Sequence, residues 1–318
     1  MYHTARKRAL PETDGLSYHP VVVLSIFLVD LSLKYAKIRI IDLYFLGVFM
    51  SIIQAVVLGV VQGLTEFLPV SSSGHLIFVP KIFGWADQGA AFDVFIHIGT
   101  LIAVVVFFRK KLWSILKSCV QYKSQGIEDK QNRRFFGLVV LSTIPAAIVG
   151  LAFGDAIEVH LRNPILVGFD MIFWGIILGI AEWYSKKKNA QTQLNDLTPQ
   201  KVGAIGLAQA VALIPGTSRS GITMTTGMFL GLSKKTAAEF SFLMSIPIIA
   251  LAGASDVLKI VKHGAEGIGF LPLAVGFFAA LVSGFFALTL LLKIIEKWSL
   301  KPFVVYRIII GVLILWFL

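Results

Sequence analysis

Apolar runs of helix length alternate with short polar or basic stretches from residue 50 to the end of the chain. An α-helix needs about 20 predominantly apolar residues to cross the hydrocarbon core of a bilayer. Six runs approach that length with few charges inside them, and we expect each to form a transmembrane helix. They lie at about 92–108, 136–154, 165–184, 237–257, 271–292 and 303–318.

Two further apolar runs are interrupted by proline, glycine and hydroxyl residues. The first run, 51–68, ends at Pro69, and the apolar piece that follows at 76–83 is too short to cross. The second run, 202–214, is followed in the same way by the short piece 222–232. Irregular backbone persists at membrane depth only where protein covers it or where it lines a wet cavity. We therefore predict two re-entrant helical hairpins.

The two interrupted runs belong to an internal repeat, with one copy at about 50–188 and the other at about 201–318. Three pairs of residues share a separation of 146, namely Pro69 with Pro215, Ser72 with Ser218, and Asp93 with Glu239. Each copy holds one returning hairpin and three crossings, so the second copy must enter the bilayer from the opposite side. The predicted fold is an all-α integral membrane protein with an inverted-topology repeat, six transmembrane helices and two re-entrant helical hairpins.

Residues 1–49 fit this pattern poorly. The apolar run at 21–29 is short and is followed by several charged residues. Two interpretations remain open: an extra amphipathic segment, or translation that begins at Met50, where a clean apolar run starts. We treat 1–49 as an N-terminal extension and 50–318 as a single membrane domain.

The composition supports a membrane protein and excludes other classes. Hydrophobic residues make up 56% of the chain and charged residues 15%, and the mean hydropathy is +0.80, which is far more apolar than an ordinary globular domain. The net charge of +11 comes from basic runs between apolar segments, so we predict topogenic loops and no nucleic-acid partner. The single cysteine, Cys119, excludes an internal disulfide and a cluster of thiolate metal ligands.

Basic residues also predict the orientation in the membrane. The connections 109–134, 185–201 and 293–301 are rich in lysine and arginine, whereas 155–163 and 258–270 carry few basic residues. The positive-inside rule places the first set in the cytoplasm. The first hairpin then enters from the outer side and the second from the cytoplasm, so we expect their tips to meet near the midplane.

The two tips would bring together groups that are costly to bury without partners. These are Glu66, His75 and Arg219 together with the hydroxyl groups of Ser71, Ser72, Ser73, Thr217, Ser218, Ser220 and Thr223. A short helix is expected to begin after each break, at about Leu76 and Ile222, and its free N–H groups favour an anion. The arginine fork suits phosphate oxygens, and a carboxylate beside an anion calls for Mg²⁺ or Ca²⁺. The combination favours phosphoryl transfer.

The same residues resemble the two signature motifs of a known family. The motifs are Gln-Gly-Leu-Thr-Glu-Phe-Leu-Pro-Val-Ser-Ser-Ser-Gly-His at 62–75 and Pro-Gly-Thr-Ser-Arg-Ser-Gly at 215–221. They look like those of the bacterial undecaprenyl-diphosphate phosphatases, the bacitracin-resistance protein family. The resemblance implies hydrolysis of undecaprenyl diphosphate to undecaprenyl phosphate and inorganic phosphate, which recycles the carrier lipid for peptidoglycan synthesis. It further implies a multi-pass protein of the bacterial plasma membrane with its site open to the outer face, a divalent cation and a homodimer.

Residue roles follow from the resemblance position by position. Ser72 matches the proposed catalytic serine and is expected to attack phosphorus or to position the attacking group. His75 is expected to be a general acid or base, Glu66 a metal ligand or base, and Arg219 the clamp on the diphosphate. Gln62 would be a second metal ligand. Hydroxyl groups expected to bind substrate are those of Ser71, Ser73, Thr217, Ser218, Ser220 and Thr223.

Several alternatives stay open. Ser72, His75 or a metal-bound water could attack phosphorus, and the metal and the prenyl chain length are undetermined. A secondary transporter or lipid flippase would use the same inverted-repeat architecture. A second lipid phosphatase superfamily has similar short motifs, but its second histidine has no counterpart after Arg219. We expect Asp93 and Glu239 to cap the starts of helices, and we assign no role to His97, Asp170 or Arg307.

Overall fold

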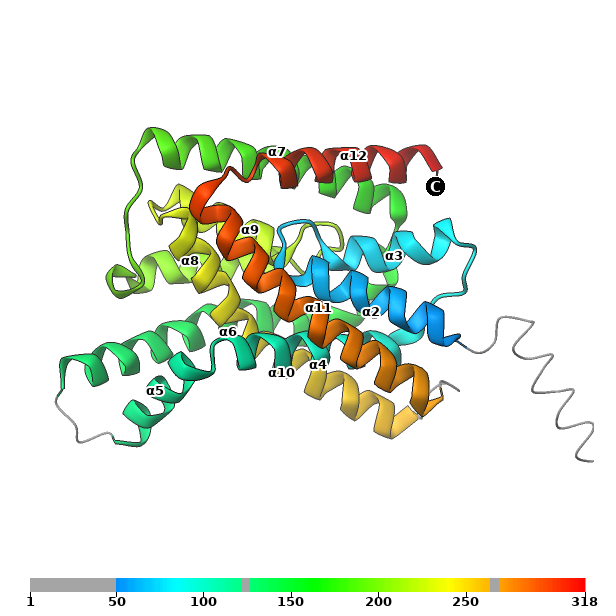
Figure 1. Ribbon diagram of the computed structural model, residues 1–318, viewed down its shortest axis with the longest axis horizontal. Coiled ribbons are helices and arrows are strands. Elements are labelled where there is room, and N and C mark those ends of the chain that lie inside the picture. The colour runs from blue at the N-terminus through cyan, green and yellow to red at the C-terminus, as the bar shows by residue number, and fades with distance from the viewer. Residues whose placement is uncertain (1–49, 122–125, 264–268, 318) are drawn as a thin grey trace, which may run out of the picture. The chain divides into compact units, whose positions relative to one another are not determined.

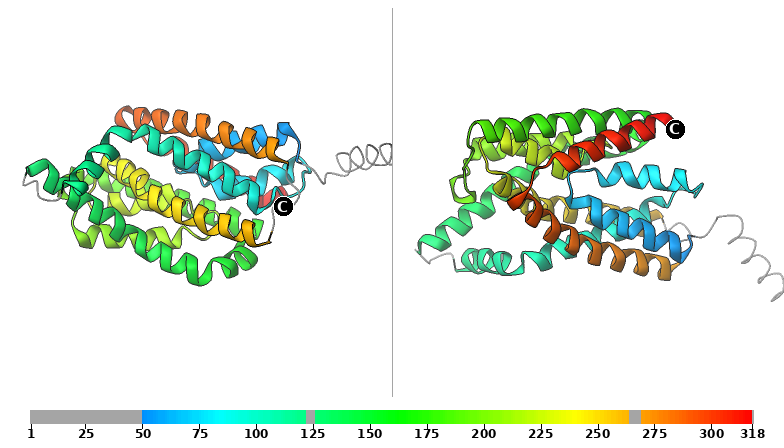
Figure 2. Two further views of the ribbon diagram at one scale, coloured as in Figure 1. Left: turned by 90° about the horizontal axis from the view of Figure 1, so that it is seen from below. Right: turned by 45° about the horizontal axis from the view of Figure 1, so that its top comes forward.

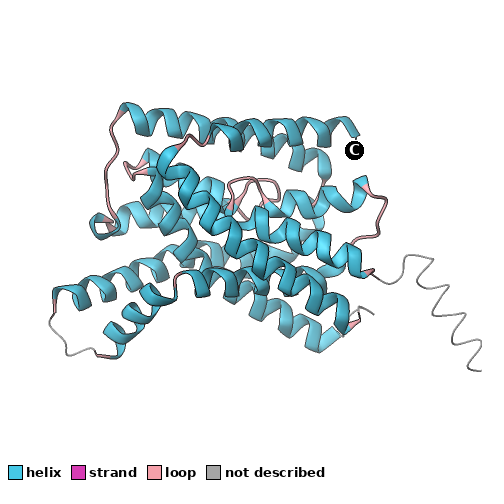
Figure 3. Cartoon of the chain, viewed as in Figure 1, coloured by secondary structure: helices cyan, strands magenta, loops and turns pink. Residues whose placement is uncertain are grey.

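The computed structural model describes residues 50–121, 126–263 and 269–317, and every regular element in these ranges is a helix (Figures 1 and 3). The helices are α2 (Ile52–Phe67), α3 (Ser72–Ile82), α4 (Gly89–Phe107), α5 (Arg109–Val120), α6 (Ile127–Leu161), α7 (Pro164–Lys187), the 3₁₀ turn η1 (Leu194–Asp196), α8 (Pro199–Val211), α9 (Arg219–Phe229), α10 (Lys234–His263), α11 (Phe270–Lys297) and α12 (Lys301–Phe317). The interpretations made for 1–49 lie outside the described residues. The predicted all-α class is confirmed.

Within the described residues, five helices are long and apolar enough to cross a membrane, so the chain is a multi-pass membrane protein. They are Gly89–Phe107, Ile127–Ile157, Pro164–Lys187, Lys234–Leu258 and Phe270–Lys297. The sixth predicted span corresponds to α12, whose 17 described residues are about five turns fewer than the 35 of α6. They also fall short of the ~20 residues that a spanning helix usually needs.

The prediction of a loop over 109–134 is wrong. Helix α5 occupies its first half, and α6 begins at Ile127. The two helices pack against each other because α5 turns Ile115 inward and because Ser118 donates to Asp129 at 2.6 Å. The basic residues of this stretch therefore lie on a helical hairpin.

The short helix after each break begins earlier in the chain than expected. Helix α3 begins at Ser72 and α9 at Arg219. The residues before them, Ser71 and Ser218, both have φ of 72°, and their hydroxyl groups accept the amides of Gly74 and Gly221. These two N-caps start the helices directly after the turn.

The matched caps also correct the alignment of the two interrupted runs. Ser71, and not Ser72, has the backbone conformation and capping bond of Ser218, so the local separation is 147. The N-caps Ser51 and Thr198 at the starts of α2 and α8 have this separation as well. Ser72 therefore occupies the position that Arg219 has in the second run. The capping prediction for Asp93 and Glu239 is also wrong, because both lie inside α4 and α10.

Two close helix pairs support the breaks. Helix α2 packs along α11, and α7 packs along α12, as the views in Figures 1 and 2 agree. Small residues allow the first approach: a Cβ added at Gly63 would lie 2.0 Å from Ser283 Oγ and 2.5 Å from the Ala280 carbonyl oxygen. Close packing through small residues is typical of membrane helices, because lipid removes most of the hydrophobic drive for association.

We expect Gly63→Ala to lower the free energy of unfolding by about 1–3 kcal/mol, the usual cost of overpacking a close interface. The added methyl group would collide with the backbone of α11. Gly203→Ala in α8 is the control, because nothing lies within 4 Å of its added Cβ. Unfolding in detergent would measure both variants, and equal stability of the two would contradict this account of the α2–α11 contact.

Candidate active site

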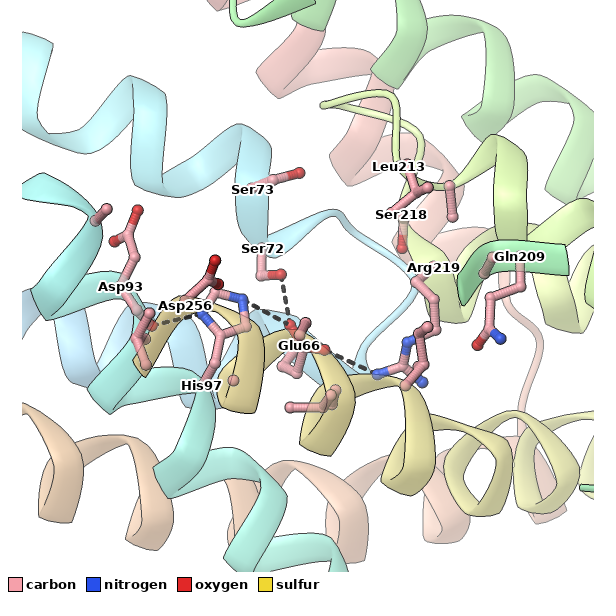
Figure 4. A pocket seen from close by; sticks show the side chains of 18 residues that line it. Glu66, Ser72, Ser73, Asp93, His97, Gln209, Leu213, Ser218, Arg219 and Asp256 are labelled. Atoms are coloured by element: carbon pink, nitrogen blue, oxygen red, sulfur yellow. Dashed lines mark hydrogen bonds and ion pairs between the residues drawn. The ribbon is translucent and has the colours of Figure 1, made fainter. Parts of the chain in front are cut away.

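A cavity of about 340 Å³ lies where the two breaks meet, and seven helices contribute to its wall (Figure 4). Its polar lining consists of Glu66, Ser72, Ser73, Asp93, His97, Gln209, Ser218, Arg219 and Asp256. The remaining wall is apolar and comes mainly from α10, with smaller contributions from α4, α6 and the turn that follows α8. The breaks touch each other directly, because the Gly216 amide donates to Ser73 Oγ at 3.4 Å and Ser220 Oγ donates to the Leu68 carbonyl at 3.0 Å.

Glu66 is the centre of the polar cluster. Its carboxylate accepts a hydrogen bond from Arg219 Nη2 at 2.8 Å, from Ser72 Oγ at 2.7 Å and from Gln62 Nε2 at 3.0 Å. The Glu66 side chain is only 7% exposed and that of Arg219 13%. The last turn of α2 thus places one carboxylate against the first residues of both α3 and α9. The structure brings Glu66, Ser72, Arg219 and Gln62 together as the sequence predicted, although Gln62 does not line the cavity.

Ser72 and Arg219 are the first residues of their helices. The free amides of a first helical turn and the positive end of the helix dipole favour negative charge. Arg219 is held in place by a second bond, from Nη1 to the Ser241 carbonyl at 3.0 Å. A phosphate group beside Ser72 would therefore meet two helix N-termini and one guanidinium.

His75 lies elsewhere. Its Nδ1 is 2.7 Å from the Ser71 carbonyl and its Nε2 is 2.7 Å from the Tyr306 hydroxyl. A carbonyl oxygen can only accept, so Nδ1 carries the proton and the neutral ring accepts the tyrosine proton at Nε2. The side chain is buried and does not line the cavity. The predicted acid or base role has no direct geometric support in this arrangement.

The predicted substrate-binding hydroxyl groups divide into two sets. Ser73 and Ser218 line the cavity. The others bond to nearby protein groups: Ser71 to the Gly74 amide, Ser220 to the Leu68 carbonyl, Thr223 to the Arg219 carbonyl, and Thr217 to Asp170. This second set holds the breaks in shape.

His97 is a cavity residue that the sequence analysis passed over. Its Nδ1 is 2.6 Å from the Asp93 carbonyl, and its Nε2 faces Glu66 Oε2 at 3.9 Å. Figure 4 shows His97 and Asp93 on one side of Glu66 and Arg219 on the other. The signal was the spacing of four between Asp93 and His97 within an apolar run, which places both on one helical face. Asp256 of α10 also lines the cavity and was not singled out.

A second cavity of about 260 Å³ adjoins the first and shares Ser73, Asp93, His97 and Leu213 with it. The rest of its wall is mostly apolar, with Arg162 at one side. This guanidinium lies 3.6 Å from the carboxylates of both Asp87 and Asp93. A polar chamber and an apolar chamber thus meet beside Ser73.

The protein groups around Glu66 do not fit a resident divalent cation. In the ranges that the structure covers, no cluster of three or more carboxylate, imidazole or thiolate groups is arranged to hold a metal. Three donors already engage the Glu66 carboxylate, and one of them is a cationic guanidinium. The Gln62 carbonyl oxygen is buried without a partner among the described groups, but it does not line the cavity.

Fold and site together define a multi-pass membrane protein in which a serine and a guanidinium contact one carboxylate at a cavity between the helices. Residues 55–313 match the family described as bacitracin resistance protein BacA, and the chain belongs to that family. The resemblance noted from the two motifs is thereby confirmed.

Curated relatives match nearly end to end. An undecaprenyl-diphosphatase of Colwellia psychrerythraea is 43% identical over 274 residues, covering 85% of this chain and all of the relative. Undecaprenyl-diphosphatase 1 of Pseudoalteromonas translucida is 44% identical over 271 residues, covering 85% of this chain and 99% of the relative. An undecaprenyl-diphosphatase of Campylobacter curvus is 44% identical over 270 residues, covering 84% and 98%.

We expect Arg219→Met alone to lower the free energy of unfolding by about 3–5 kcal/mol, because it leaves the buried Glu66 carboxylate without its cation. The double variant Arg219→Met with Glu66→Gln should recover most of that loss, since neither charge then remains. Unfolding of both variants in the same detergent measures the coupling. Additive losses in the double variant would show that the pair is not coupled in the folded protein.

Proposed function

We propose that this protein hydrolyses undecaprenyl diphosphate to undecaprenyl phosphate and inorganic phosphate. The contact of Ser72 Oγ and Arg219 with the two oxygens of Glu66 carries the proposal. It supplies a nucleophile, a base within hydrogen-bond reach and a cation for the phosphate oxygens. The relatives are named undecaprenyl-diphosphatases, and that activity agrees with this chemistry.

In the first step, Glu66 takes the Ser72 proton while Ser72 Oγ bonds to the terminal phosphorus. The anhydride P–O bond breaks, its electron pair leaves with undecaprenyl phosphate, and the phosphoryl group stays on the serine. Protonated Glu66 has lost the charge that held Arg219, so the guanidinium can follow the phosphoryl oxygens. The adjacent amides of α3 and α9 add electrostatic stabilisation.

Glu66 then releases its proton to solvent. In the second step, Glu66 takes a proton from a water molecule while the water oxygen bonds to the phosphorus of the phosphoserine. The Ser72 Oγ–P bond breaks with its electron pair on Oγ, Glu66 gives the proton to Oγ, and inorganic phosphate leaves. Direct attack by water, with Ser72 as an orienting group, uses the same residues. Trapping and mapping a phosphoenzyme distinguishes the two routes, since only the first places phosphate on Ser72.

The two chambers suit the two ends of the substrate. The diphosphate would occupy the polar cavity around Ser72 and Arg219. The first isoprenoid units would lie in the adjoining cavity, where Leu76, Ile77 and Ile157 form part of the wall. A site between membrane helices would therefore bind the apolar chain of the substrate and its diphosphate at the same time.

We further propose the inverted repeat and two re-entrant hairpins, with the site open to the outer face of the bacterial plasma membrane. Support for the repeat comes from the matching caps at Ser51 and Thr198 and at Ser71 and Ser218. Support for the orientation comes from the basic connections and the positive-inside rule. The homodimer stays a prediction.

A lipid flippase or secondary transporter is the competing proposal, because an inverted repeat is a common transporter architecture. The adjacent serine and carboxylate favour hydrolysis, since transport does not need a nucleophile. Purified protein in detergent has no gradient to use, so release of phosphate there supports the enzyme. Lipid movement in sealed vesicles without phosphate release would support the transporter.

We expect Ser72→Ala, Glu66→Gln and Arg219→Ala each to lower the rate of phosphate release from a C15 or C55 prenyl diphosphate by about 10²-fold or more. Ser245→Ala is the matched control, because this buried serine lies outside the cavity lining and donates to the Phe242 carbonyl of its own helix. Near-normal hydrolysis by folded Arg219→Ala protein would refute the assignment of the site.

The divalent cation expected from the family resemblance leads to a separate prediction. Since the protein groups alone do not fit a resident ion, we expect no saturable Mg²⁺ binding below about 1 mM to the substrate-free protein in calorimetry. Phosphate release should nevertheless stop in EDTA and return with Mg²⁺ or Ca²⁺. Tight binding to substrate-free protein that Glu66→Gln removes would instead demonstrate a preformed metal site.

A further inference from the structure

Arg307 is the largest fully buried side chain in the described part of the protein, and it lies on α12 near the middle of an apolar run. A guanidinium in such a place needs hydrogen-bond acceptors for its donors. The acceptors are backbone carbonyl groups. Nε donates to Met171 of α7 at 3.0 Å, Nη1 to Pro69 at 3.3 Å, and Nη2 to Gly216 at 3.0 Å and Thr217 at 3.1 Å.

Three of these carbonyl groups belong to the two helix breaks. Pro69 lies in the first break, three residues before Ser72, and Gly216 and Thr217 lie in the second break, just before Arg219. A single planar fork therefore ties both breaks to each other and to α7. Asp170, which accepts the Thr217 hydroxyl, interacts electrostatically with the guanidinium.

The preceding residue, Tyr306, holds the first break from another direction. Its hydroxyl donates to His75 Nε2, and His75 Nδ1 donates to the Ser71 carbonyl. Ser71 directly precedes Ser72. Two neighbouring residues of α12 thus restrain the backbone on both sides of the turn that presents Ser72.

We propose that Tyr306 and Arg307 are positioning residues that set the distance between Ser72 and Arg219 across Glu66. This inference rests on the proposed hydrolysis for its kinetic consequences. Neither side chain lines the cavity, so neither is a catalytic residue. His75 acts with them as the link between Tyr306 and Ser71, and this accounts for its place outside the cavity.

Arg307→Lys is the principal test. One ammonium has three donors at a single point and cannot reach four carbonyl groups in three segments, whereas the guanidinium fork can. We expect kcat for a prenyl diphosphate to fall about 10–100-fold with KM changed less than about 3-fold, as for lost transition-state geometry. Arg307→Ala should be more severe than Arg307→Lys.

Glu182→Gln supplies a control at the other end of the α7–α12 pair. Glu182 accepts the Leu300 amide and the Ser299 hydroxyl at the start of α12. This variant should lower stability and leave kcat unchanged below the unfolding transition. If Arg307→Lys behaves in the same way, with lower stability and normal kcat, Arg307 is merely structural and the proposal is overturned.

A gentler variant covers the case in which Arg307→Lys fails to fold. A Cβ added at Gly175 would lie 3.0 Å from Arg307 Cβ, so Gly175→Ala shifts the intact arginine. Gly179→Ala is its matched control on the same helix face, because its Cβ would meet Val304 at an ordinary 3.5 Å. A lower kcat in Gly175→Ala alone supports positioning, and equal kcat in both variants contradicts it.

Hydrogen–deuterium exchange gives a readout that does not need activity. Arg307→Lys should speed exchange at the Gly74 and Gly221 amides together, whereas Tyr306→Phe should affect only Gly74. Amides in the middle of α11 should not change. Unchanged exchange in both breaks of Arg307→Lys would overturn the proposal even if kcat fell. Faster exchange in a protein whose wild type releases no phosphate would support positioning while the proposed hydrolysis fails.

Discussion

A break in a helix at membrane depth leaves backbone carbonyl groups that neither lipid nor the helix itself can satisfy. This constraint governs the centre of the protein, where two such breaks meet. Arg307 donates hydrogen bonds to four backbone carbonyl groups, three of which belong to the breaks. Ser71 and Ser218 satisfy backbone amides instead, because their hydroxyl groups cap the helices that follow. The packing of α7 against α12 places that arginine, so the pair is part of the support of the site.

The cluster around Glu66 follows from the same geometry. Because α3 and α9 begin immediately after their caps, Ser72 and Arg219 both stand at helix N-termini facing the last turn of α2. The buried carboxylate and guanidinium balance each other in the resting protein. Transfer of the Ser72 proton to Glu66 would remove one partner of that balance and release the other for phosphate. Burial of the ion pair would thus couple transfer of the Ser72 proton to stabilisation of the phosphate charge by Arg219.

The two breaks have matching backbones and different chemistry. Ser72 and Arg219 occupy equivalent first positions of α3 and α9, although one is a hydroxyl and the other a guanidinium. An alignment by residue identity alone paired Ser72 with Ser218, because it matches the two serines at a separation of 146 and ignores backbone conformation. The caps give a separation of 147. Backbone conformation resolved the register, since only Ser71 shares the positive φ and the capping bond of Ser218.

Hydropathy was sufficient to predict an all-helical membrane protein and the positions of its main helices, because a lipid environment permits few structures other than helices in an apolar chain of this kind. The motifs were sufficient for the family, and they singled out Glu66, Ser72 and Arg219, which the structure brings into contact. Tertiary structure alone decided where each imidazole lies: His75 turns to Tyr306, 231 residues away in the chain, and His97 turns to Glu66. It also decided the partners of Arg307, whose acceptors come from three distant segments. Local sequence determines helix, cap and break through short-range sterics and hydrogen bonding, whereas the partner of a buried polar group depends on which distant helix packs beside it.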